Sequence, residues 1–240
     1  MPQFDLKKAN VYFIDGFKTT GAVNNTSGYV TGTTTMKMDG TTVSVPKGAT
    51  FTLAGDDQIY EVTDKTDTLG ATTSVTFTPG LIIAATDNEV MTFDGVRLRA
   101  KIGEGNITYD EKRTMEYKKD RGLLDNVREG DQEPIDVRLD IQWEFLVSNA
   151  SEPPTPEEAL KNEGNASTWV ASGADPCEPY SVDLLIVYTP HCSGVKAELI
   201  RLPEYRYESL NHDAKAGTLS TSGKCNVTKA VISRSLQAIL

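Results

Sequence analysis

The residues of this chain that are best suited to hold a metal are its three cysteines and two histidines. Thiolate and imidazole groups are ligands that zinc prefers, and structural zinc sites draw them from closely spaced pairs. Here gaps of 14, 20 and 12 positions separate four clusters, which are Cys177, His191-Cys192, His212-Asp213 and Cys225. This spacing argues against a zinc site.

Oxygen ligands are offered by five aspartates of the N-terminal half, which are Asp56, Asp57, Asp64, Asp67 and Asp87. Calcium loops place such residues at alternate positions before a glycine, as in Asp-x-Asp-x-Asp-Gly. That spacing is absent from the sequence. A calcium site is therefore not predicted, and the chain is expected to carry no metal.

The sequence also lacks the motifs of nucleotide binding and of nucleophilic catalysis. The segment 217–225, GTLSTSGKC, has five residues between its glycines and then Cys225 after its lysine, whereas a P-loop has four residues and then Ser or Thr. Neither histidine lies near a Gly-x-Ser-x-Gly or cysteine-nucleophile motif. The sequence predicts no catalytic residue, no cofactor and no enzymatic activity.

Two interpretations of the cysteines stay open. Their odd number and the lack of a Cys-x-x-Cys pair favour buried free thiols. The alternative is a disulfide between Cys177 and Cys192, which would tie the ends of a 15-residue loop. Such a bridge would form only after release from a reducing cell.

Composition bounds the class of protein. The chain of 240 residues is long enough for one large β domain or for one core with an added module. A net charge of −10 argues against a sequence-independent binder of DNA or of anionic membranes. We expect no membrane-spanning segment and no secretory signal, because neither the long apolar run nor the apolar h-region is present. The chain is expected to be made in a cytoplasm.

The strongest structural signal is the segment Ile135–Phe145, IDVRLDIQWEF, in which apolar and polar residues alternate strictly. This alternation is typical of a half-buried strand. Val96–Ile102 shows the same pattern and is the expected pairing partner. On its polar face, Arg97, Arg99 and Lys101 are expected to meet acidic groups such as Asp136, Asp140 and Glu144 of an adjoining strand.

The segment Val23–Asp94 differs in composition, with nine acidic residues against three lysines and many threonines. Six short alternating stretches separated by turn residues predict a small all-β barrel or sandwich. The expected strands are Thr34–Met38, Thr42–Val45, Thr50–Leu53, Ile59–Val62, Ser74–Phe77 and Glu89–Phe93.

A charged excursion, residues 111–134, connects the two long strands. It contains seven acidic and six basic residues, and it is predicted to be either a solvated loop or an arm that docks on a neighbouring subunit. The charges expected to dock are Lys112, Arg113, Glu116, Lys118, Lys119, Asp120, Arg121, Arg128, Glu129 and Asp131.

The last third predicts one helix and several strands. Thr155, Pro156 and Glu158 have the types and spacing of a helix start with a capping box, and the helix is expected to end near Gly164. The apolar run Ser181–Thr189 predicts a strand buried on both faces. Further strands are expected at Glu198–Leu202 paired with Tyr205–Leu210, then at Gly217–Val227 and Ala230–Arg234.

Together these elements predict a mainly β protein with a β-sandwich or barrel core, a charged arm, one short helix and a Thr-rich module. The core is assigned to residues 1–22 and 95–240, and the inserted module to residues 23–94.

Two blocks carry a family resemblance. They are Ile102–Phe145, IGEGNITYDEKRTMEYKKDRGLLDNVREGDQEPIDVRLDIQWEF, and Ala197–Arg234, AELIRLPEYRYESLNHDAKAGTLSTSGKCNVTKAVISR. They resemble the strand–arm–strand core and the closing strands of tail tube proteins from tailed bacteriophages. Together they cover about a third of the chain. The Thr-rich module is similar to small β modules of phage virion proteins.

The resemblance implies a structural protein of the virion tail, assembled in the host cytoplasm. Its main partner would be itself, in hexameric rings that stack into a hollow tube, with other tail proteins at the tube ends. Double-stranded DNA would pass through without specific binding. Six subunits would give roughly sixty negative charges per ring, which would keep DNA off an acidic wall.

Two other functions stay open. One is a single ring, such as a tail terminator or a connector to the baseplate, which would never form a filament. The other is a host-surface carbohydrate-binding module, which would need exposed aromatic residues in the segment 23–94. Its aromatic residues are Tyr29, Phe51, Tyr60, Phe77 and Phe93.

Overall fold

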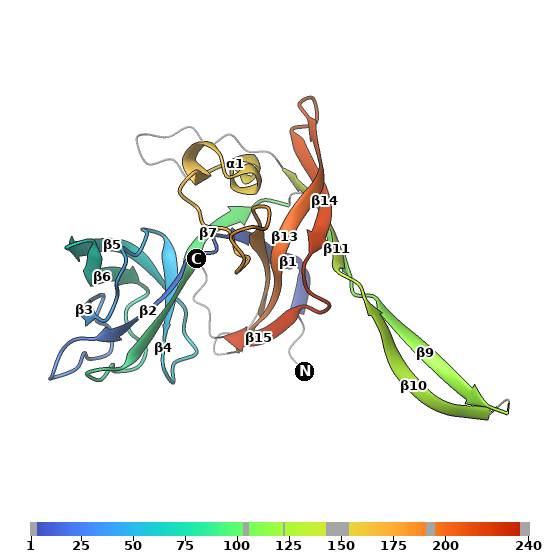
Figure 1. Ribbon diagram of the computed structural model, residues 1–240. Coiled ribbons are helices and arrows are strands. Elements are labelled where there is room, and N and C mark those ends of the chain that lie inside the picture. Colours follow the sequence, from blue (N-terminus) through green and yellow to red (C-terminus); the bar gives the residue numbers. More distant parts are fainter. Residues whose placement is uncertain (1–3, 103–105, 122, 143–153, 191–194, 236–240) are drawn as a thin grey trace.

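The structure is a computed structural model that describes residues 4–102, 106–121, 123–142, 154–190 and 195–235. It is mainly β, with 58% strand and 4% helix, which confirms the predicted class. Two β bodies lie next to each other, and a two-stranded arm projects from one of them (Figure 1).

The first body is a closed, six-stranded antiparallel barrel. The strand order is β2-β3-β6-β5-β4-β7, and β7 pairs back with β2 to close the ring. The strands are β2 (Lys18–Val23), β3 (Thr35–Asp39), β4 (Ala49–Leu53), β5 (Tyr60–Thr68), β6 (Ala71–Thr78) and the first half of β7 (Val90–Ala100). The barrel therefore takes in residues 18–22, which the sequence pattern had assigned to the core.

The barrel interior is built around a cluster of aromatic rings. Phe51 lies at its centre, with ring centroids 5.2 Å from Tyr60, 5.2 Å from Phe77 and 5.3 Å from Phe93. All four side chains are buried. Alternation along the strands sends these residues inward and turns most of the strand threonines away from the barrel interior, in line with the alternating pattern of the sequence.

One predicted strand of the barrel is wrong. Residues 42–45 form no strand, and the sixth strand is β2 instead. The backbone N–H of Val45 donates to the Thr72 hydroxyl at 2.9 Å, and the Thr41 hydroxyl donates to the Thr72 carbonyl at 2.8 Å. These side-chain hydrogen bonds, with one backbone bond from the Thr72 N–H to the Val43 carbonyl at 3.3 Å, take the place of a regular ladder, and Pro46 has no N–H to continue one.

The second body is an antiparallel sheet in the order β7-β1-β12-β13-β14-β11-β8, with β15 paired to β13. Its β7 strand is the second half of the long strand that also closes the barrel. The other strands are β1 (Phe4–Ile14), β8 (Ile107–Asp110), β11 (Ile135–Gln142), β12 (Val182–Pro190), β13 (Ala197–Asp213), β14 (Thr218–Cys225) and β15 (Val231–Ser235).

The short helix α1 (Pro156–Lys161) and the 3-10 turn Gly164–Ala166 supply Leu160 and Ala166 to the main core of this sheet. The Thr155 hydroxyl accepts from the Glu158 N–H, and the Glu158 carboxylate accepts from the Thr155 N–H. This confirms the predicted capping box. The helix ends earlier than expected, because Asn162 adopts the left-handed C-cap conformation with φ 56°.

Strand β12 is buried on both faces, as predicted from its continuous apolar run. Leu184 and Ile186 face the main core, whereas Leu185 and Val187 face a second cluster on the other side of the sheet. Ile59 of the barrel packs against this second cluster. The barrel therefore covers part of the sheet.

One prediction about strand pairing is tested only in part, and another is wrong. Among the described residues, β11 pairs with β14 and β8, and it contacts the predicted partner segment through the hydrogen bond from the Gln142 N–H to the Lys101 carbonyl at 2.7 Å. Arg99 donates to Asn10 of β1. The expected pair around residues 198–210 is one continuous 17-residue strand, β13. Residues 143–145, the expected end of β11, lie outside the described residues.

Candidate functional site

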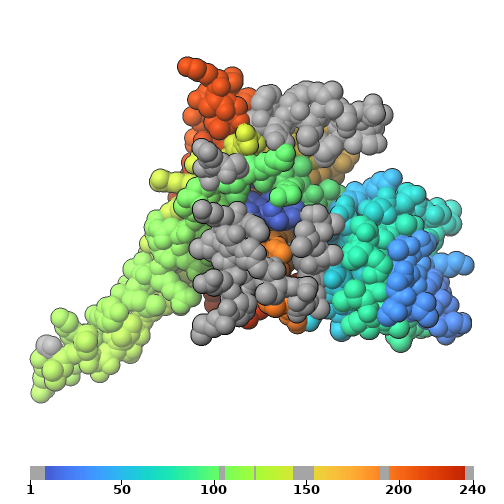
Figure 2. Space-filling model, turned by 180° about the vertical axis from the view of Figure 1, so that it is seen from behind, coloured from blue at the N-terminus to red at the C-terminus, as the bar shows by residue number. Residues whose placement is uncertain are grey.

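The arm is an antiparallel hairpin of β9 (Arg113–Asp120) and β10 (Leu123–Gln132). It forms a separate sheet that is not paired with the thirteen-stranded one. Both views show it reaching away from the barrel and the core (Figures 1 and 2). Asp120 pairs with Leu123, so the connection has two residues, and Arg121 adopts φ 50° there, as hairpin turns require.

The two faces of the arm differ in chemistry. Directly opposed residues of an antiparallel pair lie on the same face. Tyr117 opposes Val127, Lys119 opposes Leu124 and Glu129 opposes Met115, so one face carries four apolar side chains together with the charges of Lys119 and Glu129. A bulge at Asp125 keeps Leu124 and Val127 on that face although they are three positions apart. The opposite face is mainly charged and polar, with the opposed pairs Glu116–Arg128, Lys118–Asn126 and Asp120–Leu123.

The apolar face is exposed to solvent. Tyr117 is 61% exposed and Leu124 70% exposed, and Met115 and Val127 are also exposed. Leu123, next to the turn, is 76% exposed. A surface of neighbouring apolar side chains on a two-stranded hairpin is characteristic of an interaction site. We call Met115, Tyr117, Leu124 and Val127 the apolar face of the arm.

The charges predicted to dock have two different locations. Lys112 lies at the base of the arm and pairs with Asp136 of β11. The hydrogen bond from Lys112 holds the pKa of the Asp136 carboxyl below its ordinary value. The remaining nine predicted charges lie along the exposed hairpin, from Arg113 to Asp131, and form no ion pair with another residue of the described ranges.

Sequence reasoning identified the arm but missed its apolar residues. Met115, Tyr117 and the apolar residues of 123–127 stand among many charged neighbours, which hide the apolar pattern in the sequence. Alternation within 113–119 was available as a signal for a strand with one apolar face. It could not show that this face stays uncovered, because that depends on what else packs nearby.

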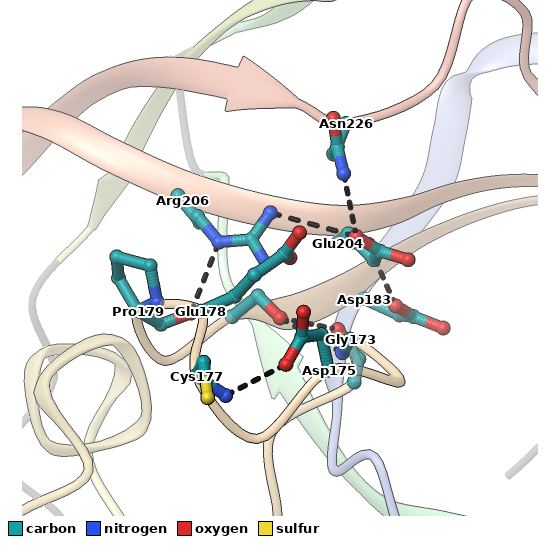
Figure 3. Close-up of polar contacts among 11 residues, drawn as sticks. Gly173, Asp175, Cys177, Glu178, Pro179, Asp183, Glu204, Arg206 and Asn226 are labelled. Atoms are coloured by element: carbon teal, nitrogen blue, oxygen red, sulfur yellow. Dashed lines mark hydrogen bonds and ion pairs between the residues drawn. The ribbon is translucent and has the colours of Figure 1, made fainter.

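The loop that holds Cys177 is fixed to the core sheet by a polar network (Figure 3). The Arg206 Nε–H donates to the Pro179 carbonyl at 3.0 Å, and the Arg206 guanidinium also pairs with Glu178 and Glu204. The Asn226 amide donates to Glu204 at 3.3 Å. The network joins this loop to β13 and to the residue that follows β14.

The thiols occupy contrasting environments. Cys177 is exposed and free in this structure, whereas Cys225 is buried, and burial raises the pKa of its thiol to about 12. The predicted partner Cys192 and the neighbouring His191 lie outside the described residues. The Cys177–Cys192 disulfide therefore stays a prediction.

Among the residues with described placement, no group of three or more His, Cys, Asp or Glu side chains is arranged to hold a metal ion. Nor does any described helix have the length and apolar character needed to cross a membrane.

Comparison with known proteins leaves the arm as the main guide to function. No protein-family model, no curated protein and no solved structure matches this chain. The class that the structure defines is a two-body antiparallel β protein with a projecting amphipathic hairpin.

Proposed function

We propose that this chain is a structural subunit of a bacteriophage tail tube that assembles with copies of itself into stacked rings. The alternative within the same class is a subunit of a single ring, such as a tail terminator or baseplate connector. In both, the arm docks on a neighbouring subunit.

The observation that carries the proposal is the uncovered apolar face of the arm. A two-stranded hairpin has little stability of its own, so its apolar residues gain most by packing against another surface. Tyr117 and Val127 oppose each other at its middle and point to the same side. Because the hairpin projects away from its own core, that surface is best supplied by another subunit.

The charged residues of the arm that form no ion pair in the described chain would contribute to specific recognition of a neighbouring subunit as well as to attraction between subunits. The face that carries Glu116 and Arg128 presents both signs within one cross-strand pair. A docking surface of complementary pattern would fix the register of the arm and disfavour wrong partners. The apolar face would then supply most of the binding energy, and the charged face the orientation.

The barrel offers less support for carbohydrate recognition. Sugar-binding surfaces use exposed aromatic rings, but Phe51, Tyr60, Phe77 and Phe93 are buried in the barrel core. Tyr29 is half-buried, and its hydroxyl accepts the backbone N–H of Lys37 at 2.8 Å. We therefore rank this function below the two ring-forming ones.

The test is assembly of purified protein at rising concentration, followed by negative-stain electron microscopy and sedimentation. Hollow filaments with a regular axial repeat are expected for a tube, and single rings that never stack for a terminator or connector. The double variant Tyr117→Thr/Val127→Thr removes an opposed apolar pair but keeps strand-forming residues. It should raise the concentration needed for assembly about a hundredfold, which corresponds to about 3 kcal/mol of lost burial.

The matched control is Glu116→Thr/Arg128→Thr, which changes the neighbouring opposed pair on the other face. This control should still assemble, with altered salt dependence. If the control abolishes assembly and the apolar variant does not, charge rather than apolar packing drives docking. A wild-type protein that stays monomeric at every concentration, with and without isolated tail particles as seeds, would contradict the proposal.

A further inference from the structure

A cavity of about 540 Å³ lies where the barrel meets the core sheet. Its walls come from β2, β4 and β7 of the barrel and from Arg201 of β13. The volume is in the range of small-molecule sites, which commonly occur where two bodies meet. No residue of the arm lines this cavity, because the arm projects away from the barrel (Figure 1).

A β-bulge turns two charged residues toward this cavity. Ala49 of β4 is opposite Val96 of β7, and Thr50 is opposite Asp94, so Gly95 is an extra residue on β7. Side chains three positions apart point to opposite faces of a regular strand, but a bulge reverses this relation. Asp94 and Arg97 consequently both line the cavity.

The cavity wall has an ordered arrangement of polar side chains. Across the three strands, Lys18 and Thr50 both lie opposite Asp94. In the next row, Thr20 and Thr52 both lie opposite Thr92. These two rows of cross-strand neighbours place threonine hydroxyl groups and Lys18 on the same cavity wall as Arg97 and Arg201.

The two arginines differ in how their donors are used. Arg201 donates to both oxygens of Asp94, at 2.8 and 3.0 Å, and to Asp183 at 2.7 Å. Its charge is therefore balanced by two carboxylates. Arg97 has Nε and Nη1 buried without a hydrogen-bond partner in the described chain, and the nearby Thr50 hydroxyl is also buried and unpartnered.

Acidic groups near Arg97 do not meet this need. Asp94 has both oxygens engaged by Arg201, and Glu61 acts on Arg97 electrostatically without forming an ion pair with it among the described residues. Burial lowers the pKa of the Arg97 guanidinium, with Asp94 opposing that effect. A buried cation with two unused donors is costly, so an added acceptor would be stabilising.

We propose that this cavity is a binding site for a small oxyanion, a phosphate or carboxylate group. The unused Nε–H and Nη1–H groups of Arg97 point to different sides of its guanidinium, so one of them, together with the Thr50 hydroxyl, would donate to the oxygens of such a group. Lys18 adds a second positive charge at the wall. The threonine rows would contact the rest of the ligand molecule. This inference is independent of the tube proposal, because it uses no residue of the arm.

The experiment measures inorganic phosphate binding by ³¹P NMR titration and by thermal shift, at ionic strength held constant with chloride. Acetate in a parallel titration distinguishes a carboxylate site from a phosphate site. We expect saturable binding of at least one of the two anions to the wild type, and a rise in Tm with its concentration. Arg97→Gln should weaken that binding at least tenfold.

The matched control is Arg99→Gln on the same strand, whose side chain is exposed and bonded to Asn10. It should bind as the wild type does. Thr50→Val removes one hydroxyl without changing the side-chain shape, and it should weaken binding a few-fold even if Arg97→Gln does not fold. Failure of the wild type to bind either anion, or equal binding by wild type, Arg97→Gln and Thr50→Val, would overturn the proposal.

Discussion

The barrel and the arm are both antiparallel β structures inserted between strands of the core sheet. The apolar residues of the barrel are buried, whereas those of the arm are exposed. The barrel closes on itself, so every strand has two neighbours and the aromatic rings pack inside. The arm has only two strands, and its apolar face remains in solvent. Closure removes both exposed edges and exposed apolar surface, whereas an open hairpin keeps both.

This difference teaches where each region obtains its stability. The barrel satisfies its own packing within one chain, and it is further held by close backbone contacts with the core. The arm depends on β9 and β10 pairing and on the Lys112–Asp136 contact at its base. We therefore expect the barrel to govern the stability of the monomer, and the arm to govern its association.

The largest expected effect tests this division directly with two aromatic residues. Phe51→Ala removes the central ring of the barrel cluster and should cost about 3 to 5 kcal/mol of unfolding free energy. Tyr117→Ala on the arm should change the stability of the monomer by no more than about 0.5 kcal/mol. Denaturant unfolding at low protein concentration provides both values. Similar losses for the two variants would break the comparison.

A second prediction compares two glycines. A Cβ at Gly95, where the barrel meets the core, would lie 1.9 Å from the Asp15 carbonyl oxygen, so Gly95→Ala should cost about 3 kcal/mol or more. On the arm, a Cβ at Gly130 would meet the Thr114 methyl group at 3.1 Å, a contact that a small shift relieves. Gly130→Ala should cost less than about 1 kcal/mol. Thermal unfolding of both variants is the measurement, and equal shifts would argue that the junction is not rigid.

The third prediction concerns pH and the same junction. Burial raises the pKa of Asp15 to about 6, while its Oδ1 accepts the N–H of Val170 at 2.7 Å. An ordinary unfolded-state pKa is 3.8, so the native state binds the extra proton between these values. Stability should therefore fall as pH rises from about 4 to about 6, by at most about 3 kcal/mol from this group.

Asp15→Asn keeps the acceptor but cannot ionise, so this part of the pH dependence should disappear. Urea unfolding at pH 4, 5, 6 and 7 measures it. Asp131→Asn, an exposed position on the arm, serves as the control and should follow the wild-type curve. An unchanged slope in Asp15→Asn would show that Asp15 is ionised in the folded protein throughout this range.

Local patterns predicted many elements of the fold. The Thr155–Glu158 capping box, the alternation of Ile135–Gln142 and the continuous apolar run of β12 each depend on neighbours within a few positions. Such features follow from backbone hydrogen bonding and side-chain periodicity, which a sequence displays directly. The pairing of β11 with β14, about eighty positions later, left no local trace.

The candidate site shows the same limit. The arm was recognisable from the sequence as a charged excursion between two long strands. Its uncovered apolar face was not recognisable, because the exposure of Tyr117 depends on whether distant segments of the chain pack against it. The cavity with Arg97 was also missed, since the bulge at Gly95 changes the face on which Arg97 lies.

The sequence by itself determined the β class, five of the six barrel strands, the helix start and the place of the arm along the chain. These depend on interactions between residues close along the chain. Only the tertiary structure decided that β2 closes the barrel, that one strand serves both bodies, and that Arg97 and Arg201 meet at one cavity. Those outcomes depend on contacts between distant segments, whose free energy is set by packing and burial rather than by local pattern.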